Sequence, residues 1–141
     1  MSQPSLSDCT LQRLPVYGDE RGQLAVIEGE ALIGFPVRRV YYLFGTVGAV
    51  SRGFHAHHRL QQLAIAVRGS CRMLLDDGRE RTSIWLDDPG SALRLPPMIW
   101  HEMHDFSDDC VLLVLADYEY DERDYIRDYA EFRRLAAGES V

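Results

Sequence analysis

Residues 52–58 read RGFHAHH, and residues 96–101 read PPMIWH. His55 and His57 are two positions apart, so on a β-strand both imidazoles project from the same face. Two imidazoles on one face can bind a metal ion together or divide the roles of acid and base. His101 follows the turn signal of the second stretch, and the five histidines of the chain gather at 55–58 and 101–104. These groups are therefore the candidate functional centre.

The segments around the histidines have the character of short β-strands. Several alternate apolar and polar residues, and Gly, Pro and Asp separate them. Many short strands at close spacing predict a β-sandwich or barrel. The expected strands are 9–14, 22–28, 38–44, 61–67, 70–75, 82–86, 92–95, 101–106 and 110–116, with turns that include Gly18-Asp19 and Asp77-Gly78.

Helical spacing occurs at the end of the chain, in residues 121–137. Apolar side chains recur there every three or four positions from Tyr125 and Tyr129 onwards. An aspartate, either Asp121 or Asp124, is a suitable N-cap. We expect an amphipathic helix that packs its aromatic side chains against the outside of the β-domain.

The composition indicates one soluble, cytoplasmic domain. The chain has 141 residues, 46% of them apolar, which suits a single core, so we expect a flexible lead at 1–8 and one domain over 9–141. All 15 basic residues are arginine, against 22 acids, and the net charge of −7 argues against a nucleic-acid partner. No apolar run approaches a membrane span. Three widely spaced cysteines indicate neither a disulfide framework nor a thiolate metal site.

The two histidine groups resemble the two signature segments of the cupin superfamily. His55 and His57 match the paired histidines of the first segment, and His101 matches the histidine of the second. Three positions depart from the pattern: the usual Glu, Gly and Asn are Gln62, Met98 and Asp105. Glutamine carries no charge and is a poor metal ligand, so the usual cage of three histidines and a glutamate is incomplete. We therefore expect no metal.

A closer resemblance is to the dTDP-sugar 3,4-ketoisomerases, the WxcM-like C-terminal family. It covers roughly residues 9–135, and its segments keep the order of the family. They are Arg39-Val40-Tyr41-Tyr42, residues 52–57, Gly69-Ser70-Cys71-Arg72, Leu75-Asp76-Asp77-Gly78, residues 100–106 and residues 120–127.

This resemblance implies a fold and a reaction. The fold is all-β, a cupin double-stranded β-helix (jelly-roll barrel) with a short C-terminal helix, in a homodimer. The reaction moves the keto group of dTDP-4-keto-6-deoxyglucose from C4 to C3 through an enediol, in the biosynthesis of a dTDP-linked deoxy sugar, with no cofactor. We expect His57 to transfer the proton as the base and His55 to assist, because paired histidines of near-neutral pKa suit both roles.

Binding the sugar nucleotide requires further side chains. Guanidinium groups suit a pyrophosphate because they present paired donors. Arg21, Arg39, Arg52 and Arg72 are candidates, and of these Arg21 and Arg72 are favoured. Alternation on the strand 38–44 places Tyr41 and Tyr42 on opposite faces, and we expect Tyr41 to face the cavity. Gln62 and His101 complete the predicted substrate site, whereas His58 and His104 are expected to be structural.

Three alternatives stay open at this point. One is a metal-dependent cupin enzyme that uses His55, His57 and His101 as ligands. Another is a sugar 3,5-epimerase, which shares the substrate class. The third is a non-catalytic cupin that only binds a sugar nucleotide.

Overall fold

The computed structural model describes residues 3–138 and consists mainly of short strands. The strands are β1 (Leu11–Arg13), β2 (Val16–Asp19), β3 (Gly22–Ala25), β4 (Arg39–Leu43), β5 (Arg52–His57), β6 (Gln62–Arg68), β7 (Cys71–Asp76), β8 (Arg81–Leu86), β9 (Ser91–Leu95), β10 (Trp100–His104), β11 (Val111–Ala116) and β12 (Tyr125–Ile126). The helical elements are the 3-10 turns η1 (Leu6–Asp8) and η2 (Glu122–Asp124) and the α-helices α1 (Glu30–Ile33) and α2 (Tyr129–Ala136).

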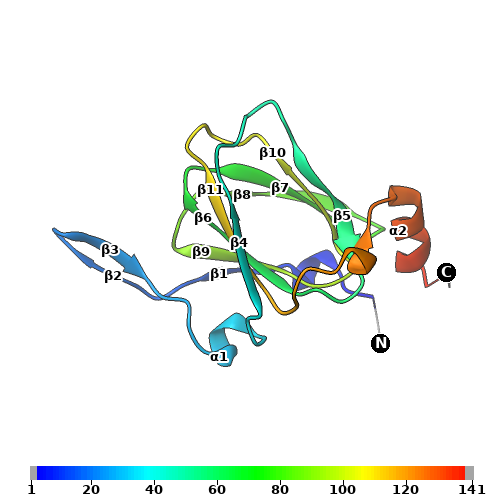
Figure 1. Ribbon diagram of the computed structural model, residues 1–141, viewed down its shortest axis with the longest axis horizontal. Coiled ribbons are helices and arrows are strands. Elements are labelled where there is room, and N and C mark those ends of the chain that lie inside the picture. The colour runs from blue at the N-terminus through cyan, green and yellow to red at the C-terminus, as the bar shows by residue number, and fades with distance from the viewer. Residues whose placement is uncertain (1–2, 139–141) are drawn as a thin grey trace.

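Two antiparallel sheets face each other and form a barrel (Figure 1). One has the order β1-β9-β6-β11-β4, and the other has the order β12-β5-β10-β7-β8. Strands β2 and β3 form a separate hairpin that projects away from the barrel (Figure 1). The predicted all-β barrel with a short C-terminal helix is confirmed. Within residues 3–138, no helix combines the length and the apolar character needed to cross a membrane.

The core lies between the two sheets and follows from strand alternation. On β7, Cys71, Met73 and Leu75 point inward and are almost fully buried. They belong to one apolar cluster with Leu112 and Val114 of β11, in the opposite sheet. Each large aliphatic side chain buried in this way contributes roughly 1.5–3 kcal/mol. The two sheets are therefore held face to face by side chains of every second residue.

The N-terminal segment differs from the sequence prediction. Part of the expected flexible lead is ordered, because η1 lies against the barrel: the Leu6 amide donates to Asp77 at 3.3 Å. Gln3 also donates to the Met98 carbonyl at 2.9 Å. The expected turn at Gly18-Asp19 lies inside β2, and the chain turns after it instead. Residues 1–2 of the expected lead and 139–141 of the expected domain lie outside the described residues.

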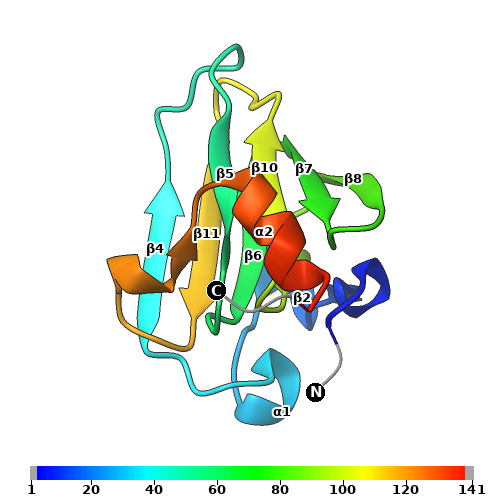
Figure 2. The same cartoon turned by 90° about the vertical axis from the view of Figure 1, so that its right-hand side faces the viewer.

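The predicted C-terminal helix begins too early. Helix α2 starts at Tyr129, where Asp128 caps the Ala130 amide at 3.1 Å. The preceding residues form η2 and then β12, in which Tyr125 pairs with His57 across the sheet. Tyr125 stands four positions before Tyr129, so it satisfies the helical spacing by coincidence, while its backbone is used to extend a sheet. The helix lies across the outside of the barrel (Figure 2).

Candidate active site

Three histidines converge inside the barrel. His55 and His57 stand on β5, and His101 on the neighbouring strand β10 is directly opposite His55. His101 is also paired with Leu75 of β7, a core residue, and residues paired across strands share a face of the sheet. The ring of His55 lies 4.9 Å from that of His57 and 4.7 Å from that of His101. The same-face arrangement predicted from the spacing is therefore present, and it faces the interior.

The three rings are held in their neutral form. Burial is the main cause, and it lowers the pKa of His55 and His57 and lowers the pKa of His101 to about 3. The neighbouring imidazoles add to the shift at His57, because a second positive charge there is unfavourable. His101 Nδ1 faces the Ile99 carbonyl at 3.2 Å and donates to it, so its Nε2 keeps a lone pair. At neutral pH the three rings are therefore uncharged, and the pKa of His57, about 2, lies far below the near-neutral value expected from the sequence.

Two backbone features position these rings. Gly53 lies where β5 approaches the irregular step of β10 between His101 and Glu102. Its φ is 90°, and a Cβ there would lie 3.0 Å from the His101 carbonyl oxygen, so the position favours glycine. Met98, in place of the usual glycine, adopts φ 62° and its amide donates to the His57 carbonyl at 2.8 Å. The turn before β10 is thereby fastened to the strand that carries the histidine pair.

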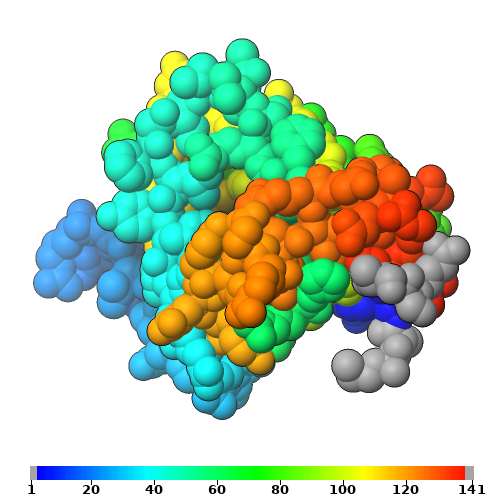
Figure 3. All heavy atoms as spheres, turned by 45° about the vertical axis from the view of Figure 1, so that its right-hand side comes forward, coloured from blue at the N-terminus to red at the C-terminus, as the bar shows by residue number. Residues whose placement is uncertain are grey.

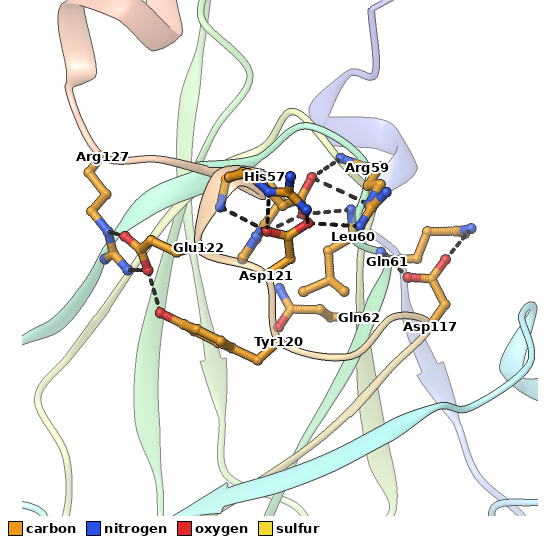
Figure 4. A network of polar contacts seen from close by, with 12 residues as sticks. His57, Arg59, Leu60, Gln61, Gln62, Asp117, Tyr120, Asp121, Glu122 and Arg127 are labelled. Carbon is orange, nitrogen blue, oxygen red and sulfur yellow. Dashed lines mark hydrogen bonds and ion pairs between the residues drawn. The ribbon is translucent and has the colours of Figure 1, made fainter.

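Tyr125 forms a further wall of the cluster. Its ring lies 4.4 Å from that of His57 and 4.9 Å from that of His55. The guanidinium of Arg127 stacks on the Tyr125 ring at 4.3 Å and pairs with Glu122 at 2.8 Å, and Tyr120 donates to the same carboxylate (Figure 4). This part of the chain crosses the surface of the barrel as the orange band between the cyan strand β4 and the red helix (Figure 3). The site thus has a wall fixed by aromatic and ionic contacts.

Tyr41 on β4 and Gln62 on β6 belong to the other sheet, where β11 lies between the two strands. Tyr41 is on the half-buried face of β4, as predicted, and its hydroxyl donates to Gln62 Oε1 at 2.6 Å. Burial raises the pKa of Tyr41 to about 12, so the phenol stays protonated. Arg39 stacks on the Tyr41 ring at 4.6 Å and on the Tyr120 ring at 5.4 Å. A guanidinium therefore stands beside the predicted substrate-binding tyrosine.

The other predicted arginines are not gathered with the histidines. Arg72 is opposite His104 on the outer face of its sheet and is bound to Asp105 at 2.8 Å and Ser83 at 3.0 Å. Arg21 is at the tip of the β2–β3 hairpin, where it pairs with Asp19. Within one subunit neither side chain lies beside the histidines, because alternation turns Arg72 outward and the hairpin carries Arg21 away.

Arg52 is exposed at the start of β5, and its side chain makes no hydrogen bond or ion pair within residues 3–138. Arg39, which the sequence offered only as one of four candidates, lies nearer the centre of the site. Sequence reasoning missed Tyr125 as a residue of the site, because it was assigned to the helix expected over 121–137. A signal was available: Asp128 is the better N-cap, since the apolar spacing of α2 is complete from Tyr129 onwards.

The donor set is also compatible with a metal ion. One nitrogen from each of His55, His57 and His101 lies within 4.8 Å of the others. Three neutral imidazoles are a known ligand set for zinc. Gln62, at the position of the usual fourth ligand, already accepts from Tyr41 through its oxygen. The described residues thus provide three ligands and lack the charged fourth.

Comparisons with known proteins agree on one family. The model of the family described as FdtA: WxcM-like, C-terminal, matches residues 7–137. A TDP-4-oxo-6-deoxy-alpha-D-glucose-3,4-oxoisomerase from Aneurinibacillus thermoaerophilus is 51% identical over 119 residues, which are 84% of this chain and 86% of that protein.

Two solved structures are similar over nearly their whole length. A mutant of the 3,4-ketoisomerase QdtA from Thermoanaerobacterium thermosaccharolyticum, in complex with TDP-4-keto-6-deoxyglucose, has a TM-score of 0.92 and 38% identity, covering 95% of this chain and 97% of that one. A 3,4-ketoisomerase from Helicobacter canadensis has a TM-score of 0.89 and 40% identity, covering 92% and 98%.

Proposed function

The chain belongs to the WxcM-like, C-terminal (FdtA) family, and from that premise we propose that it is a sugar-nucleotide 3,4-ketoisomerase acting on TDP-4-keto-6-deoxyglucose. The observation that carries the proposal is the buried, neutral pair His55 and His57 on one face of β5. Proton transfer next to a carbonyl needs such bases, and the similar proteins named 3,4-ketoisomerases supply the substrate class.

The reaction is an internal exchange of protons and electrons. The C4 carbonyl acidifies the C3 hydrogen, and His57 removes it while the C3–H electron pair forms the C3=C4 bond and the carbonyl pair moves to O4. A proton then returns to C4, and the proton of O3 passes to O4 as the C3 carbonyl forms, so the proton count is unchanged. No oxidant or reductant is consumed. His55 assists by exchanging the hydroxyl protons with the enediol.

The remaining residues bind and orient the sugar nucleotide. Gln62 has its oxygen occupied by Tyr41, so its amide N–H groups are free to donate to a sugar oxygen. His101 Nε2 accepts from a sugar hydroxyl. Arg39 and Arg52 supply guanidinium groups for the pyrophosphate. The configuration at C4 depends on the face from which the proton arrives.

Deuterium exchange tests the proposal. Purified protein incubated with TDP-4-keto-6-deoxyglucose in D₂O should yield a 3-keto product with deuterium at C4, followed by NMR. The variant His57→Asn should bind TDP with unchanged affinity and lose turnover by at least about 1,000-fold, because the base is absent. Absence of product with the wild-type protein would refute the isomerase, and binding without exchange would indicate a sugar-nucleotide-binding module.

A metal-dependent enzyme is the second candidate, because the three histidine nitrogens lie close together. The distinction is measurable in the wild-type protein. Elemental analysis of the active enzyme and turnover after exhaustive chelation should show activity without a stoichiometric transition metal. Loss of activity on chelation, restored by one metal ion per chain, would favour the metal enzyme instead.

A homodimer and a cytoplasmic location complete the proposal. Tyr17 and Leu24 on the projecting hairpin are more than half exposed, and a second copy packed on the hairpin would remove them from water. The three cysteines are free and buried, which suits a reducing compartment. Sedimentation of the wild-type protein and of a Tyr17→Ser, Leu24→Ser variant tests the dimer, which the double substitution should weaken.

A further inference from the structure

A buried carboxylate lies behind the proposed base. Asp124, in η2, is 8% exposed, and its Oδ2 atom is 3.3 Å from Nδ1 of His57. This group is not one of the histidines or the substrate-binding residues described above. It lies close to the side chains of His57 and Arg59, which Figure 4 labels.

The carboxylate is fixed by the backbone on its other side. The amides of Arg59 and Leu60 donate to Asp124 at 3.0 and 3.3 Å, one to each oxygen. The amide of His58 donates to the Asp124 carbonyl at 3.0 Å. The residue next to it, Tyr125, is paired with His57 across the sheet. The distance between the carboxylate and His57 is therefore set by several independent contacts.

This geometry favours one of the two neutral forms of His57. An ionised carboxylate can only accept, so it favours the form of His57 with hydrogen on Nδ1. Nδ1 is buried and makes no hydrogen bond among residues 3–138, and the carboxylate of Asp124 lies 3.3 Å from it. A neutral ring with hydrogen on Nδ1 leaves the lone pair on Nε2, the nitrogen on the opposite side of the ring. The present contact is poorly aligned, and such contacts often tighten when substrate binds.

We propose that Asp124 is the positioning residue of the base: its carboxylate holds the hydrogen of His57 on Nδ1 and stabilises the imidazolium that forms when Nε2 takes the C3 proton. This role rests on the proposed isomerase function. A nearby negative charge favours the cation formed in that step. Asp124 acts through His57 and does not itself exchange a proton with the sugar.

The chain offers a matched control in Asp117. Its carboxylate is equally buried, at 7% exposed, and it accepts from the next amide of the same loop, that of Gln61, at 2.9 Å. Its second oxygen accepts from the Gln61 side chain at 3.1 Å. Asp117 anchors the loop as Asp124 does but contacts no histidine within residues 3–138. A purely structural role predicts similar results from both sites.

Kinetics of two amide variants compare the sites. Asp124→Asn keeps an oxygen for a backbone amide but presents N–H groups, which favour the wrong form of His57. We expect kcat about 100- to 1,000-fold lower with KM changed less than about threefold. Asp117→Asn should retain kcat within about twofold. Equal losses in the two variants, or a kcat for Asp124→Asn within about twofold of wild type, would overturn the proposal.

Nitrogen NMR of the wild-type protein gives a readout that does not depend on turnover. Two-bond spectra of ¹⁵N-histidine-labelled protein distinguish the Nδ1–H and Nε2–H forms, and the signal missing in His57→Asn identifies His57. The Nδ1–H form is expected, and a dominant Nε2–H form refutes the proposal. If the protein has no isomerase activity, this spectrum still tests the contact, so failure of the function and failure of the inference are separable.

Discussion

His101 is predicted to make the protein sensitive to acid. Its ring is buried in the barrel, and burial lowers its pKa to about 3, whereas an unfolded histidine has a pKa of about 6.5. Below pH 6.5 the unfolded chain therefore binds a proton that the folded chain does not. The contribution of His101 to stability is complete above that pH and is lost as the pH falls toward 3.

The size of the effect follows from this difference. Each pH unit between the two pKa values costs about 1.4 kcal/mol, so lowering the pH from 7 to 5 removes about 2 kcal/mol through His101 alone. That is a large part of the 5–15 kcal/mol typical of a domain. The variant His101→Asn removes the titrating ring but keeps an N–H that can donate to the Ile99 carbonyl, the present partner of Nδ1.

Urea unfolding at fixed protein concentration measures both proteins at pH 7 and pH 5. The wild-type free energy of unfolding should fall by about 2 kcal/mol more than that of His101→Asn between these values. The substitution also lowers the free energy of unfolding at both pH values, because it leaves a cavity. This loss cancels when the change between pH 7 and pH 5 in the variant is compared with the same change in the wild-type protein. An equal fall in the two proteins would refute the reasoning, because His101 would then titrate alike in the folded and unfolded chains.

Three further substitutions test the structure around the site. Gly53→Ala should lower the free energy of unfolding by about 1–3 kcal/mol in urea titrations, because φ is positive and the new Cβ meets the His101 carbonyl oxygen. Unchanged stability would contradict the close approach of Gly53 to that oxygen. Tyr125→Ala should lower kcat/KM by at least about 10-fold in steady-state assays, and Tyr125→Phe should lower it much less, because the aromatic ring forms the wall of the site. Equal losses in the two variants would show that the hydroxyl, and not the ring, is required. Tyr129→Phe should cost about 1–2 kcal/mol of stability by calorimetry, because its hydroxyl donates to buried Asp76 at 2.7 Å, and no change would show that this bond contributes nothing.

Much of the barrel was predictable because strands carry local information. The alternation in Cys71, Met73 and Leu75 assigns an inner and an outer face within six residues, and the turn residues mark where each strand ends. The same period places His55 and His57 together. Such features depend on neighbours along the chain, so they are readable without knowledge of the rest of the fold.

The errors arose where a local pattern had two readings. Tyr125 fits the spacing of a helix, yet its backbone pairs with β5, because an exposed strand edge gains hydrogen bonds by adding a short strand. Arg72 was placed correctly on the polar face of its strand, but that face is the outside of the barrel, where Asp105 binds it. Neither outcome is encoded in the residues next to these positions.

By itself the sequence determined the barrel, the paired histidines of β5 and the resemblance to a family of sugar-nucleotide isomerases. Only the tertiary structure decided what surrounds the pair: His101 from β10, Tyr125 from β12 and the Asp124 carboxylate behind His57. The physical reason is that two side chains on one strand are related by a fixed period, whereas contacts between strands depend on register. A carboxylate 67 residues further along the chain reaches His57 through such a register, since Asp124 directly precedes β12, which pairs with β5.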